Sequence, residues 1–154
     1  MMFKTHLAFG FLIGLLSLRF FEPKNTIIFL FITSLFAIFP DIDERNSKIG
    51  RKLKFLSYPI GLIFKHRGLF HTIYPPIVIL ILFLILNNVI YGIAAFLGYF
   101  SHLLMDALTI NGIRPLHPLI DKRIRGFVKT NTFLEFLIFL LIIAIDFYGI
   151  LNYI

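Results

Sequence analysis

The residues best suited to chemistry in this sequence are a histidine and an aspartate, His102 and Asp106, near the end of a long apolar run. On a helix, residues four apart lie on one face about one turn apart, so both side chains can reach a single ion. Ionisable groups within apolar membrane segments are costly and often mark a functional site. The alternative is that Asp106 only marks the end of the helix and contacts water or a lysine. The spacing therefore fits two roles, an ion-binding pair or a helix end.

The composition indicates a membrane protein built of helices. Of the 154 residues, 58% are hydrophobic and 20 are phenylalanine, and the mean hydropathy is +0.89. Lipid cannot hydrogen-bond the backbone, and no alternating barrel pattern is visible, so the spanning segments are expected to be helices. The sequence has no cysteine. Disulfide bonds and thiolate ligands are thereby excluded, and any metal must be bound by histidine and carboxylate.

Five apolar runs predict an all-α fold, a polytopic membrane helical bundle that forms one integral membrane domain over residues 1–154. The runs cover residues 7–21, 26–39, 72–86, 89–108 and 132–154. The first run resembles a signal peptide, but no clear cleavage site follows it, so a retained helix is expected. Each of the first two runs covers about 22 Å as a helix, less than the roughly 30 Å hydrocarbon layer. A compact bundle is therefore expected.

Basic residues predict which side of the membrane each loop faces. The net charge is +7, and residues 41–71 are basic with apolar residues at a spacing that suits a short amphipathic helix on the membrane surface. An ordinary solvated loop is the alternative. If the runs alternate across the bilayer, this segment, the basic loop 109–131 and the N-terminus share one face. The positive-inside rule makes that face cytoplasmic. We expect a multi-pass protein of the cytoplasmic membrane that binds anionic lipid headgroups and no nucleic acid.

The remaining polar residues gather at the same ends of the runs. They are His6, Asp41, Asp43, His66, His71, His102, Asp106 and Glu135. Separately they have ordinary explanations: Pro-Asp often ends a helix, and Glu135 suits a first helical turn. Together they predict one shallow pocket of imidazole and carboxylate groups, the ligand set of hydrolytic zinc or manganese centres. Such a centre acidifies water and polarises a phosphoryl oxygen, which Arg67 could also bind through its planar guanidinium.

Five motifs carry a resemblance to a known family. In chain order they are Thr5-His6-x3-Gly10, Pro40-Asp41-Ile42-Asp43, His66-Arg67-Gly68-x2-His71-Thr72, Gly98-Tyr99-x-Ser101-His102-x3-Asp106-x2-Thr109 and Thr130-x4-Glu135. Over its whole length the chain resembles the YdjM-type membrane-bound metal-dependent hydrolases of bacteria and archaea. The His-x3-Asp motif is also similar to that of zinc-dependent phospholipase C and the P1-type nucleases. Those are all-helical enzymes that cleave phosphodiesters with a cluster of three zinc ions.

The resemblance implies both a site and an activity. It makes seven residues the metal ligands: His6, Asp41, His66, His71, His102, Asp106 and Glu135. It makes Asp43 a further ligand or a general base. From its own chemistry we expect Arg67 to stabilise charge on the phosphoryl oxygens. The implied cofactor is zinc, or else manganese, as two or three ions. Because Asn131 replaces a histidine of the phospholipase motif, two ions are favoured. The resemblance does not supply the substrate; from the site itself we expect hydrolysis of a phosphoester, with lipids among the candidate substrates, at the cytoplasmic membrane face.

Two other functions use similar residues. A metal-ion or small-solute transporter would place histidine and aspartate on an ion path, but near the bilayer midplane rather than at one face of the membrane. A non-catalytic small membrane protein would tolerate alanine at these positions without loss of fold. Metal content and the effect of alanine substitutions separate the three possibilities.

Overall fold

The computed structural model describes residues 1–44, 47–52, 54–55, 58 and 68–153. Within these residues the regular elements are helices, accompanied by two isolated β-bridges. The α-helices are α1 (Phe3–Ser17), α2 (Thr26–Phe36), α3 (Lys48–Lys52), α5 (Tyr74–Ile85), α6 (Val89–Ala107) and α7 (Phe133–Tyr153), and the 3-10 helices are η1 (Phe39–Asp43) and η2 (Leu69–His71). The predicted all-α fold is confirmed for the described part of the chain.

Local sequence explains several helix starts. At the start of α2, the Asn25 side chain accepts a hydrogen bond from the Ile28 N–H at 3.0 Å, as an N-cap residue does. Proline lies in the first turn of both η1 and α5. Proline is tolerated at these positions because the first backbone N–H groups of a helix have no partner within it.

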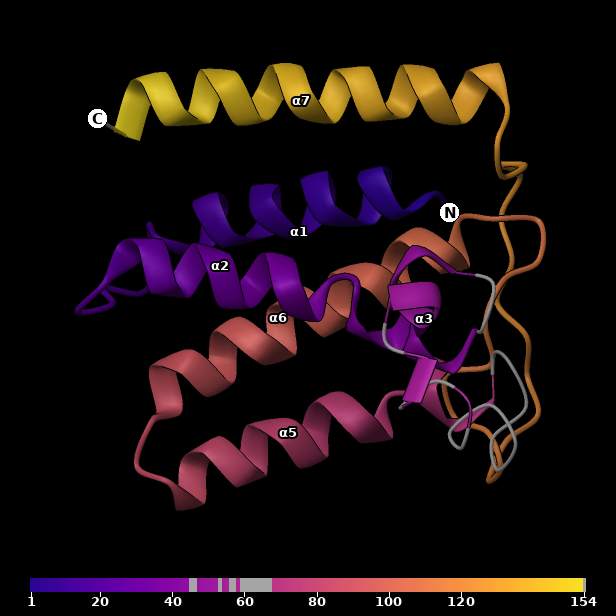
Figure 1. The fold of residues 1–154 in the computed structure, drawn as a ribbon, viewed down its shortest axis with the longest axis horizontal. Helices are drawn as coiled ribbons and strands as arrows, with labels where there is room; N and C mark the ends of the chain where they lie inside the picture. The colour runs from indigo at the N-terminus through magenta and orange to yellow at the C-terminus, as the bar shows by residue number, and fades with distance from the viewer. Residues whose placement is uncertain (45–46, 53, 56–57, 59–67, 154) are drawn as a thin grey trace.

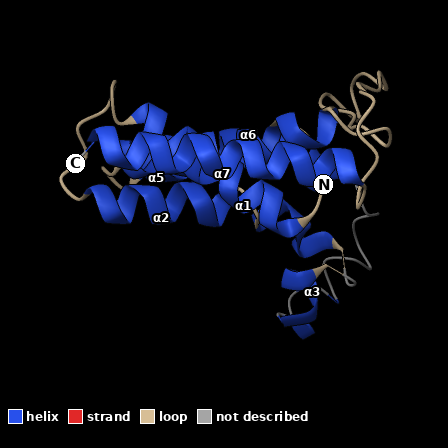
Figure 2. Ribbon diagram, turned by 90° about the horizontal axis from the view of Figure 1, so that it is seen from above, coloured by secondary structure: helices blue, strands red, loops and turns tan. Residues whose placement is uncertain are grey.

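Helix α6 lies at the centre of the bundle and packs against α1, α2 and α5, while α7 packs along α1 (Figure 1). In the perpendicular view of Figure 2 the long helices again run side by side. Two glycines permit the closest approaches. A Cβ atom at Gly98 would overlap the Thr33 carbonyl of α2, and one at Gly10 would overlap the Ala37 side chain. These glycines therefore bring α1 and α6 close to the end of α2.

Two helices are long and apolar enough to cross a membrane, namely α6 and residues Phe133–Asn152 of α7. The other apolar helices, α1, α2 and α5, have 15, 11 and 12 residues. At the helical rise they cover about 16 to 23 Å, less than the roughly 30 Å hydrocarbon layer. The five predicted apolar runs are thus helical, but five full spans are not confirmed. The described residues by which the predicted runs exceed these helices lie in turns, bends, irregular segments and the 3-10 helix η1.

The predicted amphipathic helix falls largely outside the described residues. Within them, Lys48–Lys52 forms the short helix α3, which exposes Arg51 and Lys52. The second basic loop is described in full. It is held together by β-bridges between Thr109 and Val128 and between Ile113 and Ile124.

One end of the bundle collects the segments that carry the predicted site. The start of α1, the end of α2 with η1, the start of α5, the end of α6 and the start of α7 all lie there (Figure 1). Successive apolar helices run in opposite directions. Polar residues at the start of one run and at the end of the next therefore come together at this end. The loop between α6 and α7 lies at the same end.

Candidate metal centre

Six of the predicted site residues meet at this end of the bundle. They are His6 of α1, Asp41 and Asp43 of η1, His71 of η2, and His102 and Asp106 of α6. Ligand atoms of five of them, all but Asp43, form two overlapping groups of three, each with all ligand atoms within 4.8 Å of one another. The first group is His6, Asp41 and His102, and the second is His71, His102 and Asp106. His102 belongs to both groups and is the centre of the cluster.

The two ring nitrogens of His102 have different surroundings. Nδ1 lies 2.9 Å from the carbonyl oxygen of Ala37. A carbonyl oxygen only accepts hydrogen bonds, so Nδ1 carries the proton and donates it. In the neutral ring Nε2 then has a lone pair, and it lies 3.3 Å from His71 Nε2, 3.8 Å from Asp106 Oδ2 and 3.9 Å from Asp41 Oδ1. This is the tautomer in which histidine binds a metal ion.

His71 is oriented by a carboxylate. Asp43 Oδ2 lies 3.3 Å from His71 Nδ1, and both side chains are buried. The opposite ring nitrogen, Nε2, faces the cluster and lies 3.6 Å from Asp106 Oδ2. A carboxylate behind a metal-binding histidine fixes its ring and raises its basicity. The structure therefore places Asp43 where it can position His71, while the predicted roles of ligand or general base stay predictions.

His6 reaches the cluster from α1. Its ring stacks on that of His102, with centroids 3.8 Å apart and ring planes at 14°. His6 is buried, and among the described residues neither of its ring nitrogens makes a hydrogen bond. Nε2 lies 3.4 Å from Asp106 Oδ1. Buried polar atoms without hydrogen bonds are costly, and a metal ion bound to His6 would offset that cost.

The two oxygens of Asp106 face different groups. Oδ1 lies 2.5 Å from the Met1 ammonium and 3.4 Å from His6 Nε2. Oδ2 lies 3.6 Å from His71 Nε2 and 3.8 Å from His102 Nε2. His102 has one nitrogen to offer, so it could serve an ion in only one of the two groups, and Asp106 would be a ligand in the group that contains His71.

Asp41 is the most accessible of these side chains. Its side chain is 18% exposed, and it lies outside the long apolar helices. Burial raises the pKa of the Asp41 carboxyl above its ordinary value, and the imidazole of His6 partly offsets this change. A nearby divalent cation would favour the charged form of this carboxyl.

Glu135 is buried but belongs to neither group. Its Oε1 accepts hydrogen bonds from Met2 N at 2.5 Å and Thr5 Oγ1 at 3.4 Å, and Oε2 accepts one from Asn131 N at 2.6 Å. These bonds join the start of α1 to the start of α7. Its predicted role as a ligand stays a prediction. The same holds for the ligand His66 and for Arg67, since both lie outside the described residues.

Two groups that hold the cluster together are not evident in the sequence. The Ala37 carbonyl sets the tautomer of His102, and a backbone atom has no signature in the sequence. Tyr99 is buried, and its hydroxyl donates to the Phe70 carbonyl at 2.7 Å, which fixes η2 against α6. A tyrosine inside an apolar run, directly after Gly98, is the signal that could have identified this second group.

Comparison with known proteins supports the family resemblance that the motifs carry. Residues 1–153 match the YdjM inner membrane protein family. The chain belongs to this family. The uncharacterized protein YvsG of Bacillus subtilis (strain 168) is 31% identical over 140 residues, which cover 88% of this chain and 85% of YvsG. No solved structure matches this chain.

The inner membrane protein YdjM of Escherichia coli (strain K12) is 36% identical over 92 residues, which cover 54% of this chain and 46% of that protein. The match with YdjM of Shigella flexneri has the same extent. The alignment thus spans about half the length of either YdjM protein. YdjM-family membership makes this chain a membrane protein, and α6 and α7 provide two candidate spans.

Proposed function

We propose that this YdjM-family protein is a metal-dependent hydrolase that cleaves phosphoesters at the cytoplasmic face of the membrane. The observation that carries the proposal is the pair of overlapping three-residue groups around His102 Nε2. Imidazole and carboxylate ligands without thiolate are the donor set of hydrolytic zinc and manganese sites. A cluster with a purely structural role would be expected to satisfy its buried nitrogens, and those of His6 make no hydrogen bond among the described residues.

The residues present fit one or two divalent ions. His6, Asp41 and His102 would hold one ion, and His71 with Asp106 would contribute to a second. A divalent ion held here supplies Lewis acidity to a phosphoryl oxygen and to a water molecule. The chain itself holds the protons in place, because the Ala37 carbonyl keeps one on His102 Nδ1 and Asp43 faces Nδ1 of His71.

The exposure of Asp41 suggests how substrate approaches. The other five side chains of the cluster are at most 3% exposed, whereas Asp41 is at the edge of the site. Substrate would therefore enter beside η1, which packs against the basic helix α3. Arg67 lies outside the described residues, and its proposed role is to stabilise charge on the phosphoryl oxygens of the substrate.

Basic residues support the orientation in the membrane. The loop between α6 and α7 lies at the same end of the bundle as the metal centre and exposes Lys122, Arg123, Arg125 and Lys129. Under the positive-inside rule this end would be cytoplasmic, and helices that alternate across the bilayer would make the protein multi-pass. The same cations would attract anionic headgroups and phosphate-bearing substrates.

The test is elemental analysis of the detergent-purified protein, followed by a screen of phosphomonoesters and phosphodiesters. The wild type is compared with the double variant His102→Ala, Asp106→Ala and with His117→Ala, a control at a histidine whose side chain is 43% exposed. We expect zinc or manganese in the wild type and the control, and none in the double variant, which should still insert into membranes. Absence of metal in all three after metal is added back would refute the proposal. Bound metal with ion flux in proteoliposomes but no hydrolysis would favour a transporter.

A further inference from the structure

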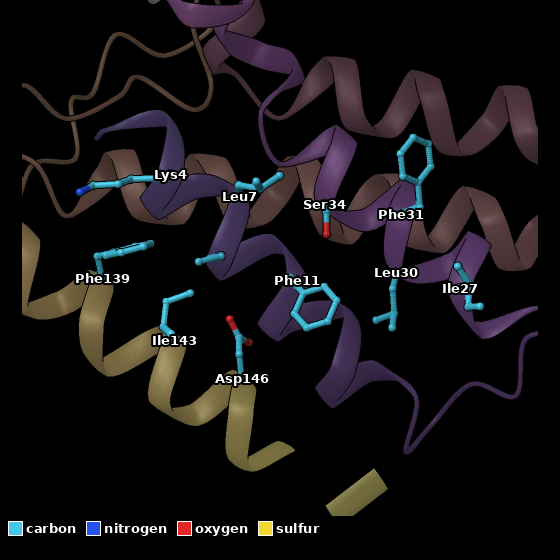
Figure 3. Close-up of a pocket in the computed structure, with 11 residues that line it drawn as sticks. Lys4, Leu7, Phe11, Ile27, Leu30, Phe31, Ser34, Phe139, Ile143 and Asp146 are labelled. Atoms are coloured by element: carbon cyan, nitrogen blue, oxygen red, sulfur yellow. The ribbon is translucent and has the colours of Figure 1, made fainter. Parts of the chain in front are cut away.

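A groove lies between α1, α2 and α7 (Figure 3). Its volume is about 690 Å³, within the range of about 300–1,000 Å³ that is common for ligand sites. Its lining is mainly apolar and includes Leu7, Phe11, Leu30 and Ile143. Phe31, at its rim, is 64% exposed. The groove therefore opens on the outer surface of the bundle, where the hydrocarbon chains of the membrane lie.

A lysine marks the end of the groove nearest the metal centre. The Nζ atom of Lys4 lies 4.8 Å from the ring centroid of Phe139 and 5.3 Å from that of Phe136. Lys4 is two residues from His6, and Phe136 directly follows Glu135. Lys4 and His6 thus both lie near the start of α1. Residues two apart on a helix point to different faces, so the cationic end of the groove shares an end of the bundle with the candidate metal centre and not a face of α1. A phosphate held at Lys4 would lie at the site end of the groove.

Two polar side chains reach the apolar part of the groove. Asp146 is 5% exposed, and its Oδ1 makes no hydrogen bond among the described residues. The buried Ser34 Oγ also makes none there. Figure 3 shows both side chains at the groove between the three helices. A carboxylate without a partner among apolar side chains is costly, so a bound molecule that donates a hydrogen bond would be held here.

We propose that the groove binds the hydrocarbon chain of a membrane lipid substrate, with the phosphate of the lipid at Lys4 and a hydroxyl or amide N–H on its chain donating to Asp146. The role of this lipid as substrate rests on the proposed hydrolase function. The spacing of the two polar ends agrees with one molecule, because Phe139 and Asp146 lie about 10 Å apart along α7. The substrate class is therefore a phosphate-bearing lipid with a hydrogen-bond donor on its chain.

A lipid suits the groove better than a helix from a second copy of this chain. A helix would fit the apolar lining, and an exposed side chain of a second copy, such as Tyr148, could donate to Asp146. A helix of apolar residues, however, brings no anion to Lys4. A phosphate-bearing lipid supplies the apolar chain and the anion together, and charge complementarity with Lys4 favours a phosphate at that end.

Two probes test the proposal on the full chain in detergent, with a chelator present. They are monoacylglycerol phosphates of equal chain length, one of which carries a hydroxyl about 10 Å from its phosphate. The hydroxylated probe should bind about tenfold more tightly, as expected for one hydrogen bond to a charged group. Asp146→Leu should remove this difference, and Asp146→Asn should keep part of it.

Two tryptophan variants test the groove itself. Ile143→Trp fills the groove and should weaken binding of both probes about tenfold or more. The control Leu141→Trp is on the same helix but outside the groove lining, at a residue that is 62% exposed, and should leave binding unchanged. Equal binding of both probes to the wild type, or binding unaffected by Ile143→Trp, would overturn the proposal. A change from dimer to monomer in Ile143→Trp without any effect on lipid binding would assign the groove to a second copy instead.

The binding assay also separates this inference from the proposed function. Binding is measured without metal, so it does not require hydrolysis. A protein that binds the hydroxylated probe selectively but cleaves no phosphoester supports the groove and contradicts the hydrolase. A protein that cleaves soluble phosphoesters but binds neither lipid probe supports the hydrolase and contradicts the groove.

Discussion

The Nδ1 atom of His102 lies 2.9 Å from the carbonyl oxygen of Ala37, so a backbone atom at the end of α2 fixes the protonated nitrogen of a side chain on α6. This contact depends on how closely the two helices approach. Gly98 lies against the Thr33 carbonyl, one turn before Ala37 on α2. Packing between two apolar helices therefore controls which nitrogen of His102 is free to face the candidate metal centre.

The first prediction concerns this approach. Gly98→Ala places a Cβ atom into the Thr33 carbonyl and must push α2 away from α6. The hydrogen bond from His102 to Ala37 should weaken, and zinc affinity should fall about 10- to 100-fold, as when outer contacts of metal ligands are lost. Competition with a fluorescent chelator measures the affinity. Gly149→Ala is the control, because no atom outside its own helix lies closer than 3.5 Å to its added Cβ. Equal affinity of both variants would contradict this account.

The second prediction separates a metal ligand from a packing residue at His6. His6→Phe keeps a ring of similar shape that can stack on His102, but it removes both nitrogens. We expect the variant to fold and insert with little change in thermal stability when no metal is present. It should bind less zinc, and added zinc should stabilise it less than the wild type, because ligand binding stabilises only the state that binds. Thermal unfolding in detergent, with zinc and with chelator, measures both effects. Equal stabilisation by zinc would exclude His6 from the ligands.

The third prediction concerns Glu135, whose oxygens accept hydrogen bonds from Met2, Thr5 and Asn131. Glu135→Ala leaves these donors without their acceptor and should destabilise the protein by about 2–5 kcal/mol. The loss should be equal with zinc and with chelator if Glu135 only connects α1 to α7. A larger loss with zinc would show that Glu135 is also a ligand, as the sequence predicts. Glu22→Ala, at an exposed turn residue, is the control.

The sequence predicts the part of the site that depends on helix direction. Because apolar runs alternate in direction, residues at the end of one run and the start of the next lie at one end of the bundle. This alternation alone places His6, Asp41, His71 and His102 together. The spacing of His102 and Asp106 requires only helical geometry. Both inferences rest on periodicity, which is visible in a single sequence.

The sequence does not predict features set by packing between helices. The first apolar run begins at residue 7, but α1 begins at Phe3, and inside the bundle Thr5 Oγ1 donates a hydrogen bond to Glu135. The polar residues at the start of α1 therefore belong to the helix and not to a preceding loop. Glu135 accepts hydrogen bonds from α1 because α1 and α7 pack together, so this role is not visible in the sequence either. Such tertiary contacts join residues far apart in the chain and leave no local pattern.

The last prediction concerns pH and Asp41. Burial raises the pKa of its carboxyl, and the carboxyl must lose its proton to bind a metal. Zinc affinity should therefore fall as the pH is lowered, and this fall should begin at a higher pH than for an ordinary aspartate, whose pKa is about 3.9. Stability of the metal-free protein has the opposite sign: the folded state holds this proton more tightly, so stability decreases as the pH rises through the raised pKa.

Asp41→Asn tests this assignment, because an amide does not titrate in this range. The variant should bind zinc more weakly at neutral pH, and its affinity should depend less steeply on pH in the acid range, since only the imidazoles still compete with protons. Zinc affinity measured by chelator competition across a pH series gives both slopes. Asp121→Asn, at a loop carboxylate that pairs with Arg114 on the surface, should match the wild type. Identical slopes for Asp41→Asn and the wild type would mean that Asp41 does not lose a proton when the metal binds.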